Sequence, residues 1–339
     1  MGGEVKILTE YIAQIEFSAM QMHQNMIIFP ILHTKTSNIE YITLKEALEK
    51  GDLYVREVDE EGSVPELKVI NKGDIPVLML DGEELVGAKQ NRVLNTSILL
   101  KEKSETVIPV SCAESGRWTF KSKHFKDSGV VMSASARRAK NYSVSESLLK
   151  EKSFRSNQGR VWEEIDVLVM KAEVHSSTSA MKDVFEKRKK EIDEYVNNFK
   201  IVPHQRGLFV MINGEVIGFD ILSSEDVYSK LHQKLVKSYS MEAWLSKKES
   251  KGKLSIDEEK IRNKAQSFLN KIRDVTWKRF ESVGYGWDYR YKGKDTVGSV
   301  LLYNEDVIHM SFFRIPEEEY DVNMKDSRTR MMNRYGLIM

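Results

Sequence analysis

The sequence has a single cysteine, only six prolines among 339 residues, and no long uninterrupted run of apolar residues. One cysteine cannot form a disulfide within the chain, which argues against the disulfide-stapled modules of secreted proteins. No segment approaches the roughly 18 to 20 apolar residues that a membrane-spanning helix needs, and the first residues lack the basic-then-apolar layout of a secretory signal. We therefore expect a cytoplasmic protein that does not cross a membrane.

A surplus of charge is missing as well, because 52 Lys and Arg residues face 51 Asp and Glu residues and give a formal net charge of +1. General nucleic-acid binders carry an excess of Lys and Arg for phosphate contacts, so this composition argues against general nucleic-acid binding. Hydrophobic residues make up 41% of the chain, which suffices for a buried core and excludes a wholly disordered chain.

Residues 23–130 have the pattern of β-structure. Apolar and β-branched runs of strand length recur here, at residues 26–32, 76–80, 93–100 and 106–112. One helix is expected to interrupt them, because Thr43 and Glu46 have the spacing of a capping box and Gly51 follows the last helical residue.

From about residue 145 the apolar residues change to helical spacing, first from Val161 to Ala172 and then from Met181 to Phe199. The run Ser176–Ser179 offers N-cap residues for the second of these stripes. Asn213-Gly214, between two apolar runs, predicts a tight β-hairpin over residues 207–222.

Two further helices are predicted within residues 224–280, the second opening at a Ser255–Glu258 capping box. A β-meander that turns around residues 304–306 is expected to follow. Strands, helices, strands, helices and strands without regular alternation favour the α+β class, with an antiparallel β-sheet core in the first half, a helical second half and a closing β-meander.

We interpret residues 1–315 as a single domain followed by a charged tail at 316–339. Its parts are a β-rich part over 23–130, a helical and hairpin part over 145–282 and closing strands over 283–313. Apolar stripes and low net charge also lead us to expect a homo-oligomer of closed symmetry.

The densest polar chemistry lies in two segments of the β-rich part, residues 80–97 and 108–118. Arginine can hold a phosphate with two hydrogen bonds, amides can bond ribose or base edges, and an aromatic ring can cover a flat ligand. The candidate ligand-binding residues are Gln90, Asn91, Arg92, Asn95, Arg117 and Trp118, and the candidate catalytic carboxylates are Glu83, Glu84 and Glu114.

Strand geometry limits this hypothesis, because side chains alternate along a regular strand. Gln90 and Arg92 then face one side, while Asn91 and Asn95 face the other, so one pocket needs a bulge or turn near Gly87. The competing interpretation is a structural polar network, in which these side chains satisfy backbone groups or a subunit interface.

The two segments resemble the ARPP domain family, named for its association with ADP-ribosylglycohydrolase and rhodanese-like phosphatase proteins. The resemblance rests on LDGEELVGAKQNRVLNTSILL and IPVSCAESGRW and extends over roughly residues 23–245, through NMIIFPI, YITLKEALEKGDLYVREV, HQRGLFVMINGEVIGFDIL and KLVKSYSMEA. Ala113 departs from the family, where a bulkier residue is expected. The resemblance implies binding or processing of ADP-ribose or another NAD-derived nucleotide.

Two classes of function stay open from the sequence. In an enzyme, a hydrolase of a glycosidic or phosphate bond, Glu114 or the Glu83–Glu84 pair would act as general base or hold magnesium. In a non-catalytic ligand sensor or assembly module, the same residues would only recognise a ligand or a subunit. Cys112 is expected in the core, and the histidines show no zinc-site spacing.

Overall fold

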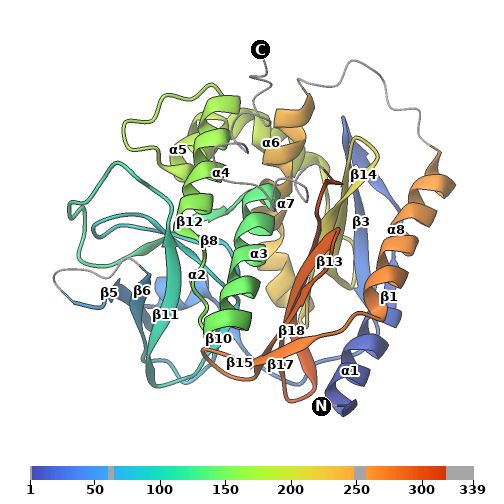
Figure 1. Cartoon of the computed structure of the whole chain (residues 1–339), viewed down its shortest axis with the longest axis horizontal. Coiled ribbons are helices and arrows are strands. Elements are labelled where there is room, and N and C mark those ends of the chain that lie inside the picture. Colours follow the sequence, from blue (N-terminus) through green and yellow to red (C-terminus); the bar gives the residue numbers. More distant parts are fainter. Residues whose placement is uncertain (1, 60–64, 248–256, 318–339) are drawn as a thin grey trace.

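A computed structural model of the chain describes residues 2–59, 65–247 and 257–317 (Figure 1). These residues form eight helices and eighteen strands, and the strands pair antiparallel except for one parallel pair, β4 with β7. Twelve strands precede residue 132, and the last four form the closing meander. The α+β class expected from the sequence is confirmed.

A six-stranded sheet in the first half curls on itself. Its strand order is β12-β8-β9-β11-β6-β5, and the Phe125 N–H donates to the Val55 carbonyl oxygen at 2.9 Å, which links the two edges of the sheet. Apolar side chains from the strands fill the inside of this curled sheet. The strands are β5 (Leu53–Glu57), β6 (Glu66–Asn71), β8 (Glu83–Val86), β9 (Arg92–Leu94), β11 (Ser104–Cys112) and β12 (Lys126–Val131).

A small sheet of β4 (Ile42–Thr43), β7 (Val77–Met79) and β10 (Ile98–Leu100) adjoins it. Helix α2 (Leu44–Lys50) follows β4 directly and has both bonds of the expected capping box between Thr43 and Glu46. Gly51 ends the helix in the left-handed region at φ 76°, a conformation that glycine adopts without steric cost.

A nine-stranded antiparallel sheet joins the two halves of the chain. Its main order is β1-β3-β13-β14-β18-β17-β16-β15, with β2 paired to β3. The run 26–32, expected in the β-rich part of the first half, lies in this sheet as β3 and pairs with β13. The predicted hairpin at Asn213-Gly214 is confirmed, with positive φ angles of 52° and 76° at its two turn residues. The strands are β1 (Ile15–Phe17), β2 (Gln21–His23), β3 (Met26–His33), β13 (Gln205–Ile212), β14 (Glu215–Leu222), β15 (Lys278–Glu281), β16 (Trp287–Lys292), β17 (Thr296–Tyr303) and β18 (Asp306–Arg314).

Helices lie on both faces of the large sheet (Figure 1). Helices α3 (Ala134–Glu151) and α7 (Glu225–Lys247) lie between it and the curled sheet, whereas α1 (Gly2–Ala13) and α8 (Glu258–Arg273) cover its other face. The remaining helices are α4 (Gln158–Lys171), α5 (Met181–Lys187) and α6 (Lys189–Asn198).

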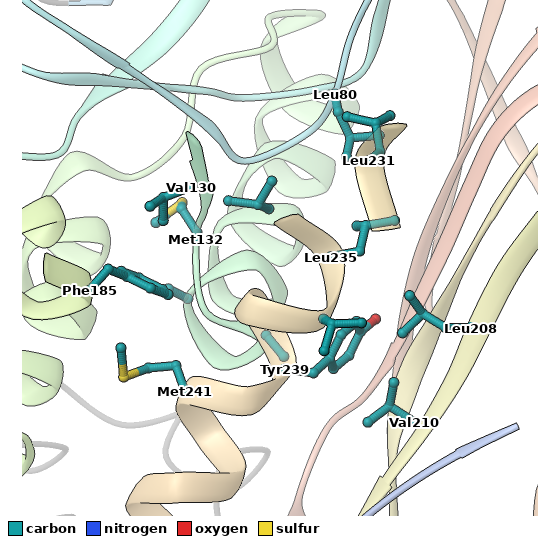
Figure 2. Packing of buried hydrophobic residues seen from close by; sticks show 14 of the residues in the cluster. Leu80, Val130, Met132, Phe185, Leu208, Val210, Leu231, Leu235, Tyr239 and Met241 are labelled. Atoms are coloured by element: carbon teal, nitrogen blue, oxygen red, sulfur yellow. The ribbon is translucent and has the colours of Figure 1, made fainter. Parts of the chain in front are cut away.

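Helix α7 is the centre of the largest hydrophobic cluster. Leu235 and Tyr239 pack towards Leu208 and Val210 of β13, and the same cluster continues to Met132 beyond the end of β12 (Figure 2). One buried helix therefore fixes the curled sheet against the large sheet.

Helices α1 and α3 depart from the sequence prediction. Helix α1 was not predicted, and it is stabilised by packing Leu8 and Ile12 on the outer face of the large sheet. Helix α3 begins at Ala134 rather than near residue 145, because its first turns bury Arg137 and Lys140, which carry no apolar periodicity.

The stripe expected over residues 181–199 is broken at Arg188, so that α5 and α6 are two helices. The expected cap among Ser176–Ser179 is also wrong, since the N-cap residue of α5 is Ala180. Asp257 caps α8 by accepting a hydrogen bond from the Lys260 N–H, whereas Ser255 lies outside the described residues, as does most of the predicted tail.

Candidate functional site

One end of the curled sheet gathers a group of polar and aromatic side chains, the rim cluster: Glu57, Lys89, Arg92, Cys112 and Trp118. Arg92 is paired in register with Cys112, and the next pair on the same face is Leu94 with Val110, both in the apolar core of the curled sheet. Glu57 continues the inward alternation of Leu53 and Val55. Strand register thus places two opposite charges at the end of an apolar interior.

Arg92 is fully buried but only partly bonded. Its Nη1 donates to the side-chain oxygen of Gln90 at 2.9 Å and to the Gln90 carbonyl at 3.3 Å. Its Nη2 lies 3.8 Å from Glu57, and within the described part of the chain neither its Nε nor its Nη2 has a hydrogen-bond partner. Unpaired buried donors are costly, so an acceptor that reached these two nitrogens would be bound. Arg92 is 0% exposed, so the fold has to open around it first.

Glu57 is the other half-satisfied member of the rim cluster. Its Oε1 accepts a hydrogen bond from the Lys89 N–H at 3.4 Å, and its Oε2 has no partner among the described residues. Burial raises the pKa of Glu57, and the nearby Arg92 opposes that rise. Burial likewise raises the pKa of the Cys112 thiol, so the thiol stays protonated at neutral pH.

Trp118 closes the rim cluster from the solvent side. Its side chain is 45% exposed, and the guanidinium carbon of Arg92 and the ammonium of Lys89 lie 5.6 Å and 5.5 Å from its ring centroid. Exposed Phe120 also has Lys89 over its ring, at 5.1 Å. Cations over aromatic faces are attracted by the ring quadrupole, which holds the indole in place while one part of it stays open to solvent.

Arg117, by contrast, is committed to internal contacts. It donates to Glu114 at 2.7 Å and 2.9 Å and to Asn91 Oδ1 at 3.1 Å, and it also donates to the carbonyls of Gly87, Ala88 and Thr119. Although burial raises the pKa of Glu114, the hydrogen bonds from Arg117, Thr178 and the Asn91 N–H hold it below its ordinary value. This arrangement fixes the loop that carries Trp118.

Glu83 is occupied on the side of α7. Its Oε1 accepts from Lys234 at 2.6 Å and its Oε2 accepts from the Leu80 N–H at 2.8 Å. Lys234 also donates to Asp127 at 2.8 Å. Burial lowers the pKa of Lys234, but its two carboxylate partners outweigh burial and keep the pKa above its ordinary value. This pair ties the curled sheet to α7.

Among the described residues, Glu84 is the buried carboxyl group with the fewest hydrogen bonds. It is fully buried, and neither of its oxygens makes a hydrogen bond of ordinary geometry to a described residue, although the Ser128 hydroxyl and the Lys182 N–H lie nearby. Burial raises the pKa of Glu84 to about 8, and the Ser128 hydroxyl and the Lys182 N–H offset this only in part. Glu84 is therefore largely protonated at neutral pH. It lies on the opposite face of β8 from Leu85, whereas Leu85 is in register with Arg92.

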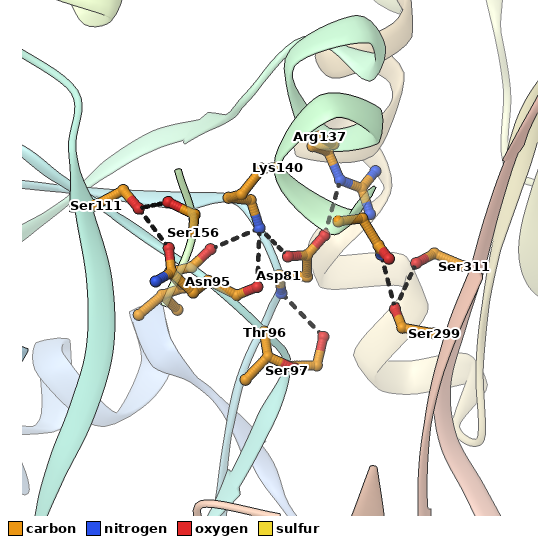
Figure 3. A network of polar contacts seen from close by, with 12 residues as sticks. Asp81, Asn95, Thr96, Ser97, Ser111, Arg137, Lys140, Ser156, Ser299 and Ser311 are labelled. Carbon is orange, nitrogen blue, oxygen red and sulfur yellow. Dashed lines mark hydrogen bonds and ion pairs between the residues drawn. The ribbon is translucent and has the colours of Figure 1, made fainter. Parts of the chain in front are cut away.

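Asn95 belongs to a third group, the interior network, which lies between the curled sheet and the large sheet (Figure 3). Its Nδ2 donates to the Phe154 carbonyl at 2.9 Å, and its Oδ1 accepts from Ser111 at 2.6 Å. The members of this network that touch α3 or the strands around it are Asp81, Asn95, Thr96, Ser97, Ser111, Arg137, Lys140, Asn141, Ser156, Asp220, Asp288, Arg290, Ser299, His309 and Ser311.

Lys140 and Arg137 on α3 are the centre of the interior network. Lys140 donates to Asp81 and to the carbonyls of Leu94 and Asn95 at 2.9 Å and 3.1 Å. Arg137 binds Asp220 of β14 with two hydrogen bonds, at 2.9 Å and 2.5 Å. Burial lowers the pKa of Lys140 to about 8 against the pull of Asp81. These bonds join the two sheets through α3.

The structure thus separates the nine residues selected from the sequence. Gln90, Arg92 and Trp118 meet at the rim cluster, with Gln90 and Arg92 on one side as strand alternation predicts. Asn91, Glu114 and Arg117 form the support beneath it, while Glu83, Glu84 and Asn95 point into three other environments.

Sequence reasoning missed two kinds of residue. Glu57 could have been found, because it occupies the third inward position of the alternating strand Leu53–Glu57. Arg137 and Lys140 carried no signal, since their partners Asp220 and Asp81 lie far from them along the chain. Among the described residues, no three His, Cys, Asp or Glu side chains are placed to hold a metal ion together.

No helix in the described ranges has the length and apolar character needed to cross a membrane. Comparison with curated proteins and with solved structures gives no significant match for the chain. A protein-family model does match, over residues 14–313, and it covers both motifs of the polar cluster together with the closing strands. The chain therefore belongs to the ARPP-1 family, described as the ARG and Rhodanese-Phosphatase-superfamily-associated Protein domain.

Proposed function

We propose that the chain binds ADP-ribose or another NAD-derived nucleotide at the rim cluster. In this proposal Trp118 stacks on the base or nicotinamide ring, and Arg92 with Lys89 holds the phosphates. Glu57 accepts a hydrogen bond from a ribose hydroxyl through its unpartnered Oε2. Arg117 is a positioning residue that fixes the loop of Trp118.

One observation supports this proposal above the others. Arg92 has two buried nitrogens without a hydrogen bond to a described residue, one of them 3.8 Å from Glu57, beside an exposed indole that carries a second cation. A phosphate would supply the missing acceptors in a charge-assisted form, and the open part of the indole suits a flat ring. The resemblance of the two motifs to a family named for its association with ADP-ribosylglycohydrolase proteins suggests the same class of ligand.

A hydrolase of a nucleotide bond is the second candidate, and the contrast between Glu84 and Glu114 favours it. Burial raises the pKa of Glu84 to about 8, whereas Arg117 helps to lower the pKa of Glu114. Such a divergence is typical of an acid and base pair. Both side chains are at most 1% exposed, so this role requires the fold to open around them. Release of a product from NAD or ADP-ribose that stops in Glu84→Gln would support it.

The binding proposal is tested by thermal shift with ADP-ribose, NAD, ATP and nucleotide sugars, with and without magnesium. A ligand at a hundredfold excess over its Kd stabilises the folded state by about 2.7 kcal/mol. Trp118→Ala should weaken binding by about fivefold to a hundredfold, because stacking of a base on an aromatic ring contributes about 1–3 kcal/mol.

Trp287→Ala is the matched control, since Trp287 is also exposed, at 38%, and has Arg279 stacked at 4.2 Å on a different part of the molecule. It should keep the thermal shift of the wild type. Absence of a shift with every nucleotide, or an equal shift in Trp118→Ala, would show that the rim cluster is not the nucleotide site.

A further inference from the structure

The loop between β11 and β12 carries a surface of unusual composition, the basic loop, residues 115–126. It contains no acidic residue, and Lys121, Lys123 and Lys126 are all exposed. Exposed Phe120, at 56%, stands beside these lysines and two residues from Trp118. Large apolar side chains at the surface of a chain usually mark an interaction site when they cluster.

A second aromatic pair extends this surface beyond the rim cluster. His124 of the basic loop packs edge-on against Tyr54 of β5, with ring centroids 5.9 Å apart. Lys72, which follows β6, lies over the Tyr54 ring, with its ammonium 4.6 Å from the ring centroid. The basic loop therefore connects two groups of aromatic rings. One is Trp118 with Phe120, under Lys89, and the other is Tyr54 with His124, under Lys72.

The basic loop is held in a defined position although it lies at the surface. Its Lys121 N–H donates to the Ala88 carbonyl at 2.9 Å, and the buried Phe125 anchors its other end through the bond to Val55. Arg117 donates to the Thr119 carbonyl at 2.8 Å from below. A fixed loop presents Trp118 and Phe120 with little ordering cost when a ligand binds.

We infer that the basic loop binds a single-stranded polynucleotide, whose bases stack on Trp118, Phe120 and the Tyr54–His124 pair while its phosphates follow the lysines. This inference rests on the proposed function and extends the ligand from a single nucleotide to a polynucleotide. Proteins that bind single strands combine a positively charged track with aromatic platforms, and base stacking tolerates any sequence. The neutral net charge of the whole chain does not oppose this, because the lysines are concentrated locally.

The test is fluorescence anisotropy with labelled twelve-nucleotide oligo(U) and oligo(dT), and with a duplex of the same length. We expect the single strands to bind more tightly than the duplex. Phe120→Ala should weaken single-strand binding by about fivefold to a hundredfold, as loss of one stacked base does.

The salt dependence gives a second readout that a structural role would not produce. Three phosphate contacts to a single strand give a slope of log K against log salt of about −2, and Lys121→Ala with Lys123→Ala should reduce its magnitude by about 1.4. The double variant Lys190→Ala with Lys260→Ala is the control, because both lysines are exposed on other helices.

A thermal shift by ADP-ribose without oligonucleotide binding would overturn this inference and leave the proposed function standing. Absence of both the ADP-ribose thermal shift and oligonucleotide binding would overturn this inference and the proposed function together. Binding to phosphatidylserine vesicles without binding to either single strand would assign the basic loop to an anionic membrane surface instead. A slope unchanged by the two loop lysines would also contradict the inference.

Discussion

Replacement of Glu84 by glutamine should change the pH dependence of stability, with the variant gaining on the wild type as the pH rises. Glu84 is fully buried, and within the described residues its two carboxylate oxygens make no hydrogen bond of ordinary geometry. The pKa of Glu84 rises from 4.5 to about 8 because burial disfavours the charged form. In the unfolded chain the same group ionises at its ordinary value.

The sign follows from proton linkage. Below pH 4.5 both states hold the proton and folding carries no cost from this group. Between pH 4.5 and about pH 8, Glu84 loses its proton in the unfolded state but keeps it in the folded state. The free energy of unfolding therefore falls by about 1.4 kcal/mol for each pH unit. The loss amounts to about 3 kcal/mol at pH 7 and stops growing above the folded-state pKa.

Glutamine at this position does not titrate, so any fixed effect of the amide is the same at every pH. The unfolding free energy of Glu84→Gln relative to the wild type should therefore rise by about 3.5 kcal/mol between pH 5 and pH 8. Urea denaturation at pH 5, 6, 7 and 8 measures this difference directly. Glu40→Gln, at an exposed position, should show less than about 0.5 kcal/mol of change. A difference for Glu84→Gln that stays constant with pH would refute the reasoning.

Three further predictions concern stability and assembly. Arg117→Ala should cost about 3–5 kcal/mol in urea denaturation, because it leaves Glu114 buried without its cation, and a loss below about 1 kcal/mol would contradict the structural role. Gly218→Ala should lower stability by about 3–5 kcal/mol, since its Cβ would overlap the Phe312 carbonyl oxygen, whereas Gly3→Ala, which meets nothing, should not destabilise. We also expect light scattering at micromolar concentration to show a homo-oligomer; a strict monomer would rule this out.

The polar side chains show where sequence reasoning stops. Strand alternation correctly placed Gln90 and Arg92 on one side, and Asn91 is instead bonded to Arg117. Alternation could not show that two nitrogens of Arg92 lack hydrogen bonds to the described residues while the Arg117 guanidinium is fully bonded. The bonds of Arg117 depend on backbone carbonyls supplied by a neighbouring loop. The two arginines look equivalent in sequence and are not equivalent in space.

Apart from Asn95, the interior network lies beyond the sequence signal. Arg137 binds Asp220, 83 positions further along the chain, and the bond forms only because α3 lies between the two sheets. The same contact explains why α3 was predicted too short, since its first turns bury charges rather than an apolar stripe. A helix that buries charged side chains has no periodicity by which to recognise it.

What the sequence determined by itself is local. The capping box at Thr43, the hairpin at Asn213-Gly214 and most strand runs of the first half arise from residues within a few positions of one another, so their pattern suffices to predict them. The run 93–100 is an exception, because it forms two strands, β9 and β10, in different sheets. The α+β class and the family follow from the order of such elements and from the two long motifs. The tertiary structure alone decided which polar groups found partners, because burial and hydrogen bonding depend on segments brought together from across the chain. It left Arg92 and Glu84 incompletely bonded for that reason.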